Sequence, residues 1–202
     1  MPRAGLDSET VTEAAAVIVD AEGPAALTLS RLAADLGVAP PSLYKHVAGL
    51  DDLIHRVATL SIRRLTNNLT AAALGRSGRQ ALLAIAEAYR SFATEHAGLY
   101  SLTQAAPKPG STAQQAEASR AVEVLGAAIR SYGVPDDLSI HAVRMVRAGL
   151  HGFADIEARG GFRMPHSVDE SFLVLVNALD ASLSNLGRRT GNQQQWLAVT
   201  EQ

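Results

Sequence analysis

The sequence TLSRLAADLGVAPPSLYKHV, residues 28–47, predicts two short helices around a tight turn. The first is expected from about Leu29 to Leu36, because apolar residues recur there at the i, i+3, i+4, i+7 spacing of one helix face. Thr28 precedes this helix in the N-cap position, where a hydroxyl oxygen accepts a hydrogen bond from the first turn. Gly37 follows it, where a left-handed residue ends a helix at little steric cost.

A second short helix is expected to begin at the pair Pro40–Pro41. Proline suits a helix start, because its ring fixes a helical φ and its missing N–H has no helical partner there. Leu43 and Val47 lie four residues apart and are predicted to face inward, which leaves polar residues facing outward. Two short helices around a turn of about three residues form a helix-turn-helix, which occurs in DNA-binding domains and also as an ordinary corner of helical proteins.

The residues of this stretch resemble those of the TetR family of bacterial transcriptional regulators. The pattern Leu-Gly-Val-x-x-x-x-Leu-Tyr-x-His-Val begins at Leu36, and Leu53-Ile54 follows in the next predicted helix. The resemblance covers residues 6–60 in detail. It implies an all-α repressor that binds operator DNA as a dimer and releases it when a small molecule enters the C-terminal domain.

The composition favours helices and excludes several kinds of site. A length of 202 residues suffices for one large or two small domains. Alanine and leucine are abundant and aromatic residues make up 4%, which favours helices over sheets. Cysteine is absent, which excludes disulfides and thiolate metal ligands. No apolar run has the form of a signal peptide or the ~18 residues of a membrane span, so we expect a cytoplasmic protein without a membrane partner.

The charge balance does not by itself indicate a nucleic-acid partner. The chain has 18 Lys and Arg against 20 Asp and Glu, a net charge of −2. Residues 1–60 hold four basic and eight acidic residues, a net charge of −4, whereas a DNA-binding domain usually carries a basic face. The DNA assignment therefore rests on the motif. We expect modest affinity and a shallow salt dependence, because few cations are available to displace counterions.

Apolar spacing and helix breakers predict further helices on both sides of the opening stretch, about nine helices in all. They are expected at about Ser8–Glu22, Asp51–Ala73, Ser77–His96, Leu99–Gln104, Thr112–Tyr132, Asp136–Arg159 and Val168–Leu186. Gly98 is interpreted as a break between two of these helices, Pro107–Ser111 as a loop, and the polar tail from Gly187 as disordered.

The helix expected at Asp51–Ala73 is too long to belong to a three-helix head alone. We therefore place a domain boundary inside it, near Arg63. This gives a helix-turn-helix DNA-binding domain at residues 1–62 and a helical regulatory domain, for ligand binding and dimerisation, at residues 63–202. In the family that the chain resembles, this helix links head to body, and its tilt would carry a ligand signal.

A recognition helix places its N-terminal residues against base edges, while the preceding helix crosses the DNA backbone. On this chain Lys45 is best suited to contact guanine or a phosphate, and Tyr44 offers a ring and a hydroxyl. The resemblance implies phosphate contacts for Thr28, Tyr44 and His46, and a base contact for Ser30. The candidate DNA-binding residues are Thr28, Ser30, Arg31, Pro40, Pro41, Ser42, Tyr44, Lys45 and His46.

Two features depart from the usual pattern of the family. Many members have a lysine that opens the next helix and grips a phosphate, whereas this chain has Leu50 there. The front of the recognition helix holds an alanine and two prolines, so shape readout and apolar contact take a larger share of recognition. His46 has a second interpretation of equal weight, as a core or capping histidine.

The chain contains no familiar set of catalytic or metal-binding residues. Its six histidines form no His-x-x-x-His or His-Glu-x-x-His pair, and no Gly-x-Ser-x-Gly, Gly-x-Gly-x-x-Gly or P-loop string occurs. We therefore expect no enzyme activity, no metal and no cofactor. Two alternatives stay open: a helical module that binds a protein or small molecule without operator binding and, with less support, a helical enzyme with a buried pocket.

The segment from Arg147 to Phe162 is similar to the C-terminal segment of one TetR subgroup, in which a His-Gly pair precedes a Glu and a Gly-x-Phe. Gly149 and Gly152 lie inside a predicted helix, where glycine costs stability compared with alanine. They can line a ligand pocket, but the favoured interpretation is close packing, at the junction with the next helix or in a dimer interface.

Side chains suited to a small-molecule pocket occur along the helices of the predicted body. The candidates are Tyr89, Phe92, His96, Tyr100, Met145 and His151, each of which could equally belong to the core. The helices at Asp136–Arg159 and Val168–Leu186 are the predicted homodimer surface, because the second is apolar around more of its circumference than one core contact needs. The predicted partners are therefore double-stranded operator DNA, a small-molecule effector and a second copy of the chain.

Overall fold

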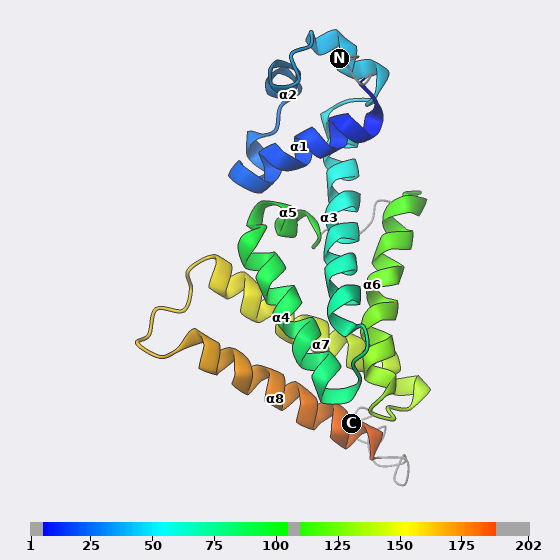
Figure 1. The fold of residues 1–202 in the computed structure, drawn as a ribbon, viewed down its shortest axis with the longest axis vertical. Helices are drawn as coiled ribbons and strands as arrows, with labels where there is room; N and C mark the ends of the chain where they lie inside the picture. Colours follow the sequence, from blue (N-terminus) through cyan, green and yellow to red (C-terminus); the bar gives the residue numbers. More distant parts are fainter. Residues whose placement is uncertain (1–5, 105–109, 189–202) are drawn as a thin grey trace, which may run out of the picture. The chain divides into compact units, whose positions relative to one another are not determined.

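The computed structural model describes residues 6–104 and 110–188, and all regular secondary structure within those ranges is helical (Figure 1). The nine predicted helices are all present there, which confirms the all-α fold. Their bounds are α1 Ser8–Glu22, α2 Leu29–Asp35, η2 Pro40–Lys45, α3 Leu50–Ala73, α4 Gly78–Glu95, α5 Ala97–Leu102, α6 Thr112–Arg130, α7 Asp136–Ala158 and α8 Val168–Gly187. A short 3₁₀ turn, η1, spans Pro24–Ala26. Most of the predicted loop at 107–111, and the tail from 189 on, lie outside the described residues.

The chain forms two compact units, each built from two separate stretches of sequence. The first unit contains the described residues up to Asn67 together with Ser91–Ser119. The second contains Asn68–Arg90 and the described residues from Arg120 on. The chain therefore passes from one unit to the other within α3, α4 and α6. Within the described ranges, none of the helices combines the length and the apolar character that a membrane crossing requires.

The core of the first unit is built from the apolar faces of α1, α2, η2 and α3. Val11 of α1, Leu32 of α2 and Leu53 of α3 are completely buried, as the helical spacing predicts. Asp7 caps α1, because its side chain accepts a hydrogen bond from Thr10 N at 2.7 Å. This bond holds the pKa of the Asp7 carboxyl below its usual value. The short helices of the predicted motif thus pack against α1, a helix whose N-terminus is capped by Asp7.

Helix α5 packs directly on α1 within the same unit. A Cβ atom built on Gly98 would lie 1.9 Å from the backbone oxygen of Val19, so only glycine fits this contact. Beside it, His96 Nδ1 lies 2.7 Å from Asp20 Oδ2. The predicted break exists, but it lies at His96 and not at Gly98, because α4 ends at Glu95 and α5 already begins at Ala97. Gly98 lies inside α5, where the missing side chain allows the helix to touch the α1 backbone.

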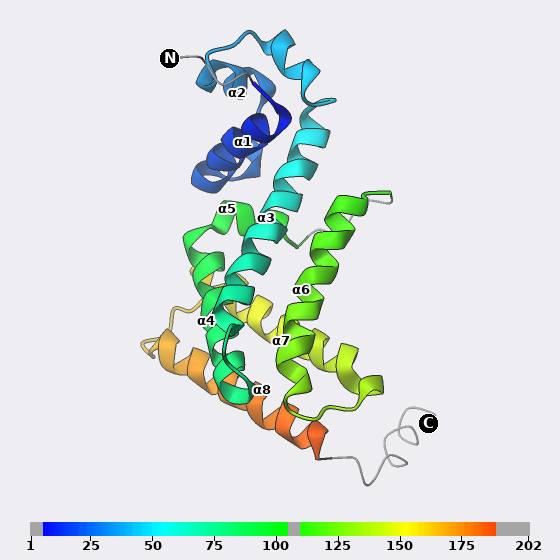
Figure 2. The same ribbon diagram turned by 45° about the vertical axis from the view of Figure 1, so that its right-hand side comes forward.

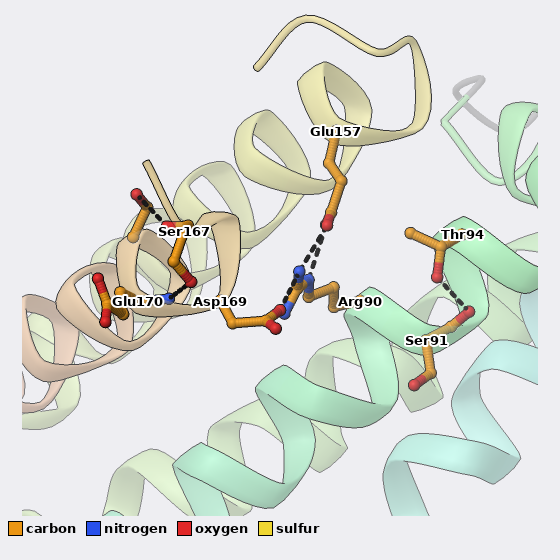
Figure 3. Close-up of polar contacts among 8 residues, drawn as sticks. Arg90, Ser91, Thr94, Glu157, Ser167, Asp169 and Glu170 are labelled. Atoms are coloured by element: carbon orange, nitrogen blue, oxygen red, sulfur yellow. Dashed lines mark hydrogen bonds and ion pairs between the residues drawn. The ribbon is translucent and has the colours of Figure 1, made fainter. Parts of the chain in front are cut away.

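In the second unit, Arg90 of α4 joins the end of α7 to the start of α8 (Figure 3). Its guanidinium donates to both oxygens of Glu157, at 2.7 and 2.5 Å, and lies 2.8 Å from Asp169 Oδ1. The same group lies 4.8 Å from the ring centroid of Phe172, a cation–π distance. The Arg90 and Glu157 side chains are each about one-fifth exposed, so water screens their pairing only partly. These hydrogen bonds hold the pKa of Arg90 above its usual value.

Replacing Arg90 by alanine is expected to lower the free energy of unfolding by about 2 kcal/mol, because Glu157 would keep a partly buried charge without its partner. Urea unfolding at a fixed protein concentration measures the change. Arg159→Ala is the matched control, since Arg159 also pairs with an acid but its side chain is 78% exposed. The control should change the free energy by less than about 0.5 kcal/mol. Equal effects of the two substitutions would contradict a stabilising role of the partly buried Arg90–Glu157 pair.

Helices α7 and α8 run side by side in opposite directions within the second unit (Figures 1 and 2). A Cβ atom on Gly149 would lie 3.4 Å from Leu175 Cδ1 and 3.5 Å from Leu179 Cδ2, which confirms close packing of α7 on α8 at that glycine. A Cβ atom on Gly152 would meet nothing within 4 Å. Within the single chain Gly152 therefore makes no close contact with α8, and the other predicted role, close packing in a dimer interface, stays a prediction for this glycine.

Candidate nucleic-acid interface

Helix α2 begins and ends as the opening stretch predicts. The Thr28 hydroxyl oxygen accepts a hydrogen bond from Arg31 N at 3.2 Å, which caps the first turn. At the other end Gly37 has a φ of 66°, and its N–H donates to Ala34 O at 3.0 Å. Val38 N donates to the oxygen of Ala33 at 2.9 Å. This pair of bonds is the Schellman motif, and it sets the direction in which the chain leaves α2.

The predicted recognition helix, η2, is a 3₁₀ helix of six residues and not an α-helix. The two prolines at its start provide no N–H, and the four helical residues after them are too few to form a series of α-helical hydrogen bonds. Ser42 N donates to Ala39 O at 2.9 Å and His46 N to Leu43 O at 2.8 Å, both over three residues. Leu43 is completely buried, which fixes the rotation of η2 and turns its polar residues outward.

The nine candidate DNA-binding residues all belong to α2, η2 and their capping residues. Six of them are exposed: Thr28, Ser30, Pro40, Pro41, Tyr44 and Lys45. The other three are half-buried: Arg31, Ser42 and His46. The Tyr44 side chain is notable because it is 62% exposed, a large aromatic surface left in water. The structure thus places these residues together on the motif, and their contact with DNA stays a prediction.

Carboxylates already hold two of the three cations that the structure describes between residues 6 and 60. Arg31 of α2 pairs with Glu22, the last residue of α1. Arg56 of α3 pairs with Asp52 at 3.0 Å. Lys45 has no carboxylate within 4 Å among the described residues. It is therefore the cation of this surface that can take up a phosphate or a guanine without first losing a partner.

His46 has a structural role through its backbone, whatever its ring contacts. Its carbonyl oxygen accepts a hydrogen bond from the Ser8 hydroxyl at 3.1 Å, which ties the end of η2 to the start of α1. Two interpretations of the ring, a DNA contact and a capping group, were open from the sequence. The half-buried position of His46 is compatible with both, so the phosphate contact stays a prediction.

Comparison with known proteins assigns the chain to a family. Residues 82–179 match the family model described as the C-terminal domain of tetracyclin repressor-like proteins. An uncharacterized HTH-type transcriptional regulator of Mycobacterium tuberculosis is 35% identical over 158 residues, which cover 78% of this chain and 72% of that protein. The chain belongs to the TetR family of transcriptional regulators. YobS of Bacillus subtilis, also an uncharacterized HTH-type regulator, is 31% identical over 172 residues, 84% of this chain and 88% of YobS.

A solved structure extends the likeness to the fold. The crystal structure of BioQ with its natural double-stranded DNA operator matches with a TM-score of 0.62 and 28% identity. The match covers 88% of this chain and 99% of the BioQ chain. The helix-turn-helix and the helical body that the sequence predicts are thus the arrangement of a TetR-family protein.

The six candidate ligand-binding residues of this TetR-family chain fall into both compact units. Tyr89, Met145 and His151 belong to the second unit, and Phe92, His96 and Tyr100 to the first. The two tyrosines and Phe92 are buried, which suits a core as well as a pocket. His96 is occupied by Asp20 and lies against the Phe92 ring, with the ring centroids 5.2 Å apart. A ligand site formed by these six residues stays a prediction.

The structure also shows a groove in the first unit, lined mainly by polar and charged residues, that the sequence analysis did not identify. Its volume is about 560 Å³, and its lining includes Glu9, Glu13, His55, Arg56 and Arg63. The Nε2 atom of His55 is buried and has no hydrogen-bond partner among the described residues. Polar residues repeat every three or four positions along one face of α1 and of α3, and that spacing could have revealed the groove. Among the described residues, no group of His, Asp and Glu could hold a metal ion.

Proposed function

We propose that the chain is a cytoplasmic repressor that binds operator DNA through α2 and η2 and releases it when a small-molecule effector binds. The exposed Tyr44 side chain beside the unpaired Lys45 is the observation that carries this proposal. A large aromatic group and an unpartnered cation on one short helix suit the base edges and phosphates of a major groove. BioQ, a relative in fold, was solved with its operator. The names of the curated relatives are those of regulators, which supports a non-enzymatic role.

The proposal includes the division of labour predicted from the sequence. Residues 1–62 would form the DNA-binding domain and residues 63–202 the regulatory domain, with α3 as the link. The effector pocket would use the six ligand candidates described above. Effector binding would select a conformation of the body whose head spacing no longer fits the operator. This mechanism needs no cofactor, metal or catalytic group.

A homodimer through α7 and α8 completes the proposal. Three large apolar residues of these helices that are exposed in the single chain support it: Ile156 is 45% exposed, Leu173 47% and Val174 67%. The open space around Gly152 leaves room for a close approach by a partner helix. Two heads on a two-fold axis would contact half-sites one helical turn apart, about 34–36 Å. Sedimentation at micromolar concentration should give twice the mass of the chain, and a monomer would contradict this interface.

Selection of bound fragments from random double-stranded DNA tests the function as a whole. We expect an inverted repeat whose half-sites are one helical turn or a multiple apart. Titrations of the selected duplex at several salt concentrations should then give a slope of log K against log salt of about −4 or shallower, at about −0.9 per phosphate contact. Recovery of no common sequence would contradict operator binding. A much steeper slope would contradict the prediction that only a few cationic side chains contact phosphates.

A further inference from the structure

We propose that Glu22 holds Arg31 away from DNA phosphates and thereby limits the affinity of the helix-turn-helix for DNA. This inference rests on the proposed function. It concerns a charge pair at the junction of α1 and α2, two helices of the first unit. The sequence alone placed Arg31 among the DNA-binding candidates, without any sign that an acid of α1 already holds it.

The pair has the fork-to-fork geometry that arginine also uses for phosphate. Arg31 Nη1 donates to Glu22 Oε2 at 2.7 Å, and Nη2 donates to Oε1 at 2.5 Å. Arg31 Nε faces a second acid, with 3.8 Å to Asp35 Oδ2. A phosphate would approach the same two nitrogens in the same plane. Glu22 therefore occupies the N–H edge of the guanidinium to which a DNA phosphate would bind.

The position of Arg31 makes this competition matter for DNA binding. Its backbone N–H donates to the Thr28 hydroxyl, so Arg31 lies in the first turn of α2, beside Ser30. Thr28 and Ser30 are the residues of α2 that the family resemblance directs to DNA. A cation in this turn would face the phosphates that the first helix of the motif crosses.

The charges of the cluster oppose DNA instead of attracting it. Glu22, Arg31 and Asp35 together carry a net charge of −1. The Arg31 side chain is 37% exposed and that of Glu22 51%, so the pair adds little to stability. The hydrogen bonds from Arg31 hold the pKa of the Glu22 carboxyl below its usual value, so the acid stays ionised at neutral pH. The pair is thus better explained by its effect on a charged ligand than by its effect on the fold.

Glu22→Gln is the direct test, because it keeps the shape of the side chain and removes its charge. The probes are the duplex that the wild-type protein selects from random DNA and an unrelated duplex of the same length. We expect Glu22→Gln to bind both about tenfold more tightly, because a phosphate contact carries no sequence information. The salt slope should steepen by about 1.8 for a dimer, which is ~0.9 for one new phosphate contact in each protomer.

Two further variants separate this explanation from a general charge effect. Glu9→Gln removes an exposed charge from the same helix α1, but Glu9 makes no ion pair within the described residues. It should leave the salt slope within about 0.3 of the wild type. Adding Arg31→Ala to Glu22→Gln should abolish the gain, because the released cation is then missing.

The outcomes distinguish this inference from the proposed function. If the wild type binds the selected duplex and Glu22→Gln binds it equally or more weakly, Glu22 does not compete for Arg31 and only the inference fails. The same conclusion follows if Glu9→Gln gives an equal gain, or if the gain survives Arg31→Ala. If the wild type selects no common sequence, the proposed function fails and the inference fails with it.

Discussion

Replacing Tyr44 and Lys45 together by alanine is expected to weaken binding to the selected duplex by at least about 100-fold, or ~2.7 kcal/mol. Lys45 lacks a carboxylate partner among the described residues, so its charge is available to DNA at no internal cost. The Tyr44 ring, 62% exposed, would lose its apolar surface on binding bases. A dimer makes each contact twice, so its total loss of binding free energy is twice the loss of one protomer. Gel-shift titration at fixed salt measures the effect.

The fold should survive this double substitution, because both side chains lie outside the core. Leu43, the residue that anchors η2 in the core, is unchanged in this variant. Thermal unfolding should therefore match the wild type to within about 0.5 kcal/mol. A matched control is Leu74→Ala with Arg76→Ala, which also removes one large exposed side chain and one cation, but from the α3–α4 turn. Binding within threefold of the wild type, roughly 0.6 kcal/mol, would remove η2 from the interface.

The elements of this fold could be predicted because their signals are local. Apolar residues at helical spacing placed α1 at its observed bounds, and the Thr28 and Gly37 signals placed the ends of α2. The nature of η2 was harder to predict. Two prolines indicate a helix start, but the short length behind them gives a 3₁₀ helix. Local rules thus predict where a helix begins and ends better than which kind of helix it is.

The contacts between helices could not be predicted in the same way. Arg31 and Glu22 lie nine residues apart, and their pairing depends on the turn that η1 makes between two helices. Arg90 and Glu157 are 67 residues apart, so no sequence spacing relates them. Buried aromatic residues such as Tyr89 give the same pattern whether they line a pocket or fill a core. For this reason the DNA-binding residues could be proposed from a motif, while the ligand site rests on side-chain character alone.

Gly98→Ala is expected to lower the free energy of unfolding by about 3 kcal/mol. The new Cβ atom would lie 1.9 Å from the backbone oxygen of Val19 and 2.8 Å from its carbonyl carbon. These are backbone atoms of α1, so they cannot move aside as a flexible side chain would. Relief of the clash requires α5 to move away from α1, which exposes Leu99 and stretches the contact between His96 and Asp20.

Gly126→Ala is the matched control, because Gly126 also lies inside a helix but its Cβ would meet only Arg130 Nη1, at 3.8 Å. Alanine is the better helix former, so this control should be neutral or stabilising by up to about 1 kcal/mol. Urea unfolding of both variants at one protein concentration gives the comparison. Hydrogen exchange adds a local measurement, since the amides of α5 should lose protection in Gly98→Ala but not in Gly126→Ala. Gly98→Ala as stable as the control would mean that α5 does not rest on the α1 backbone, and the packing of the first unit would need revision.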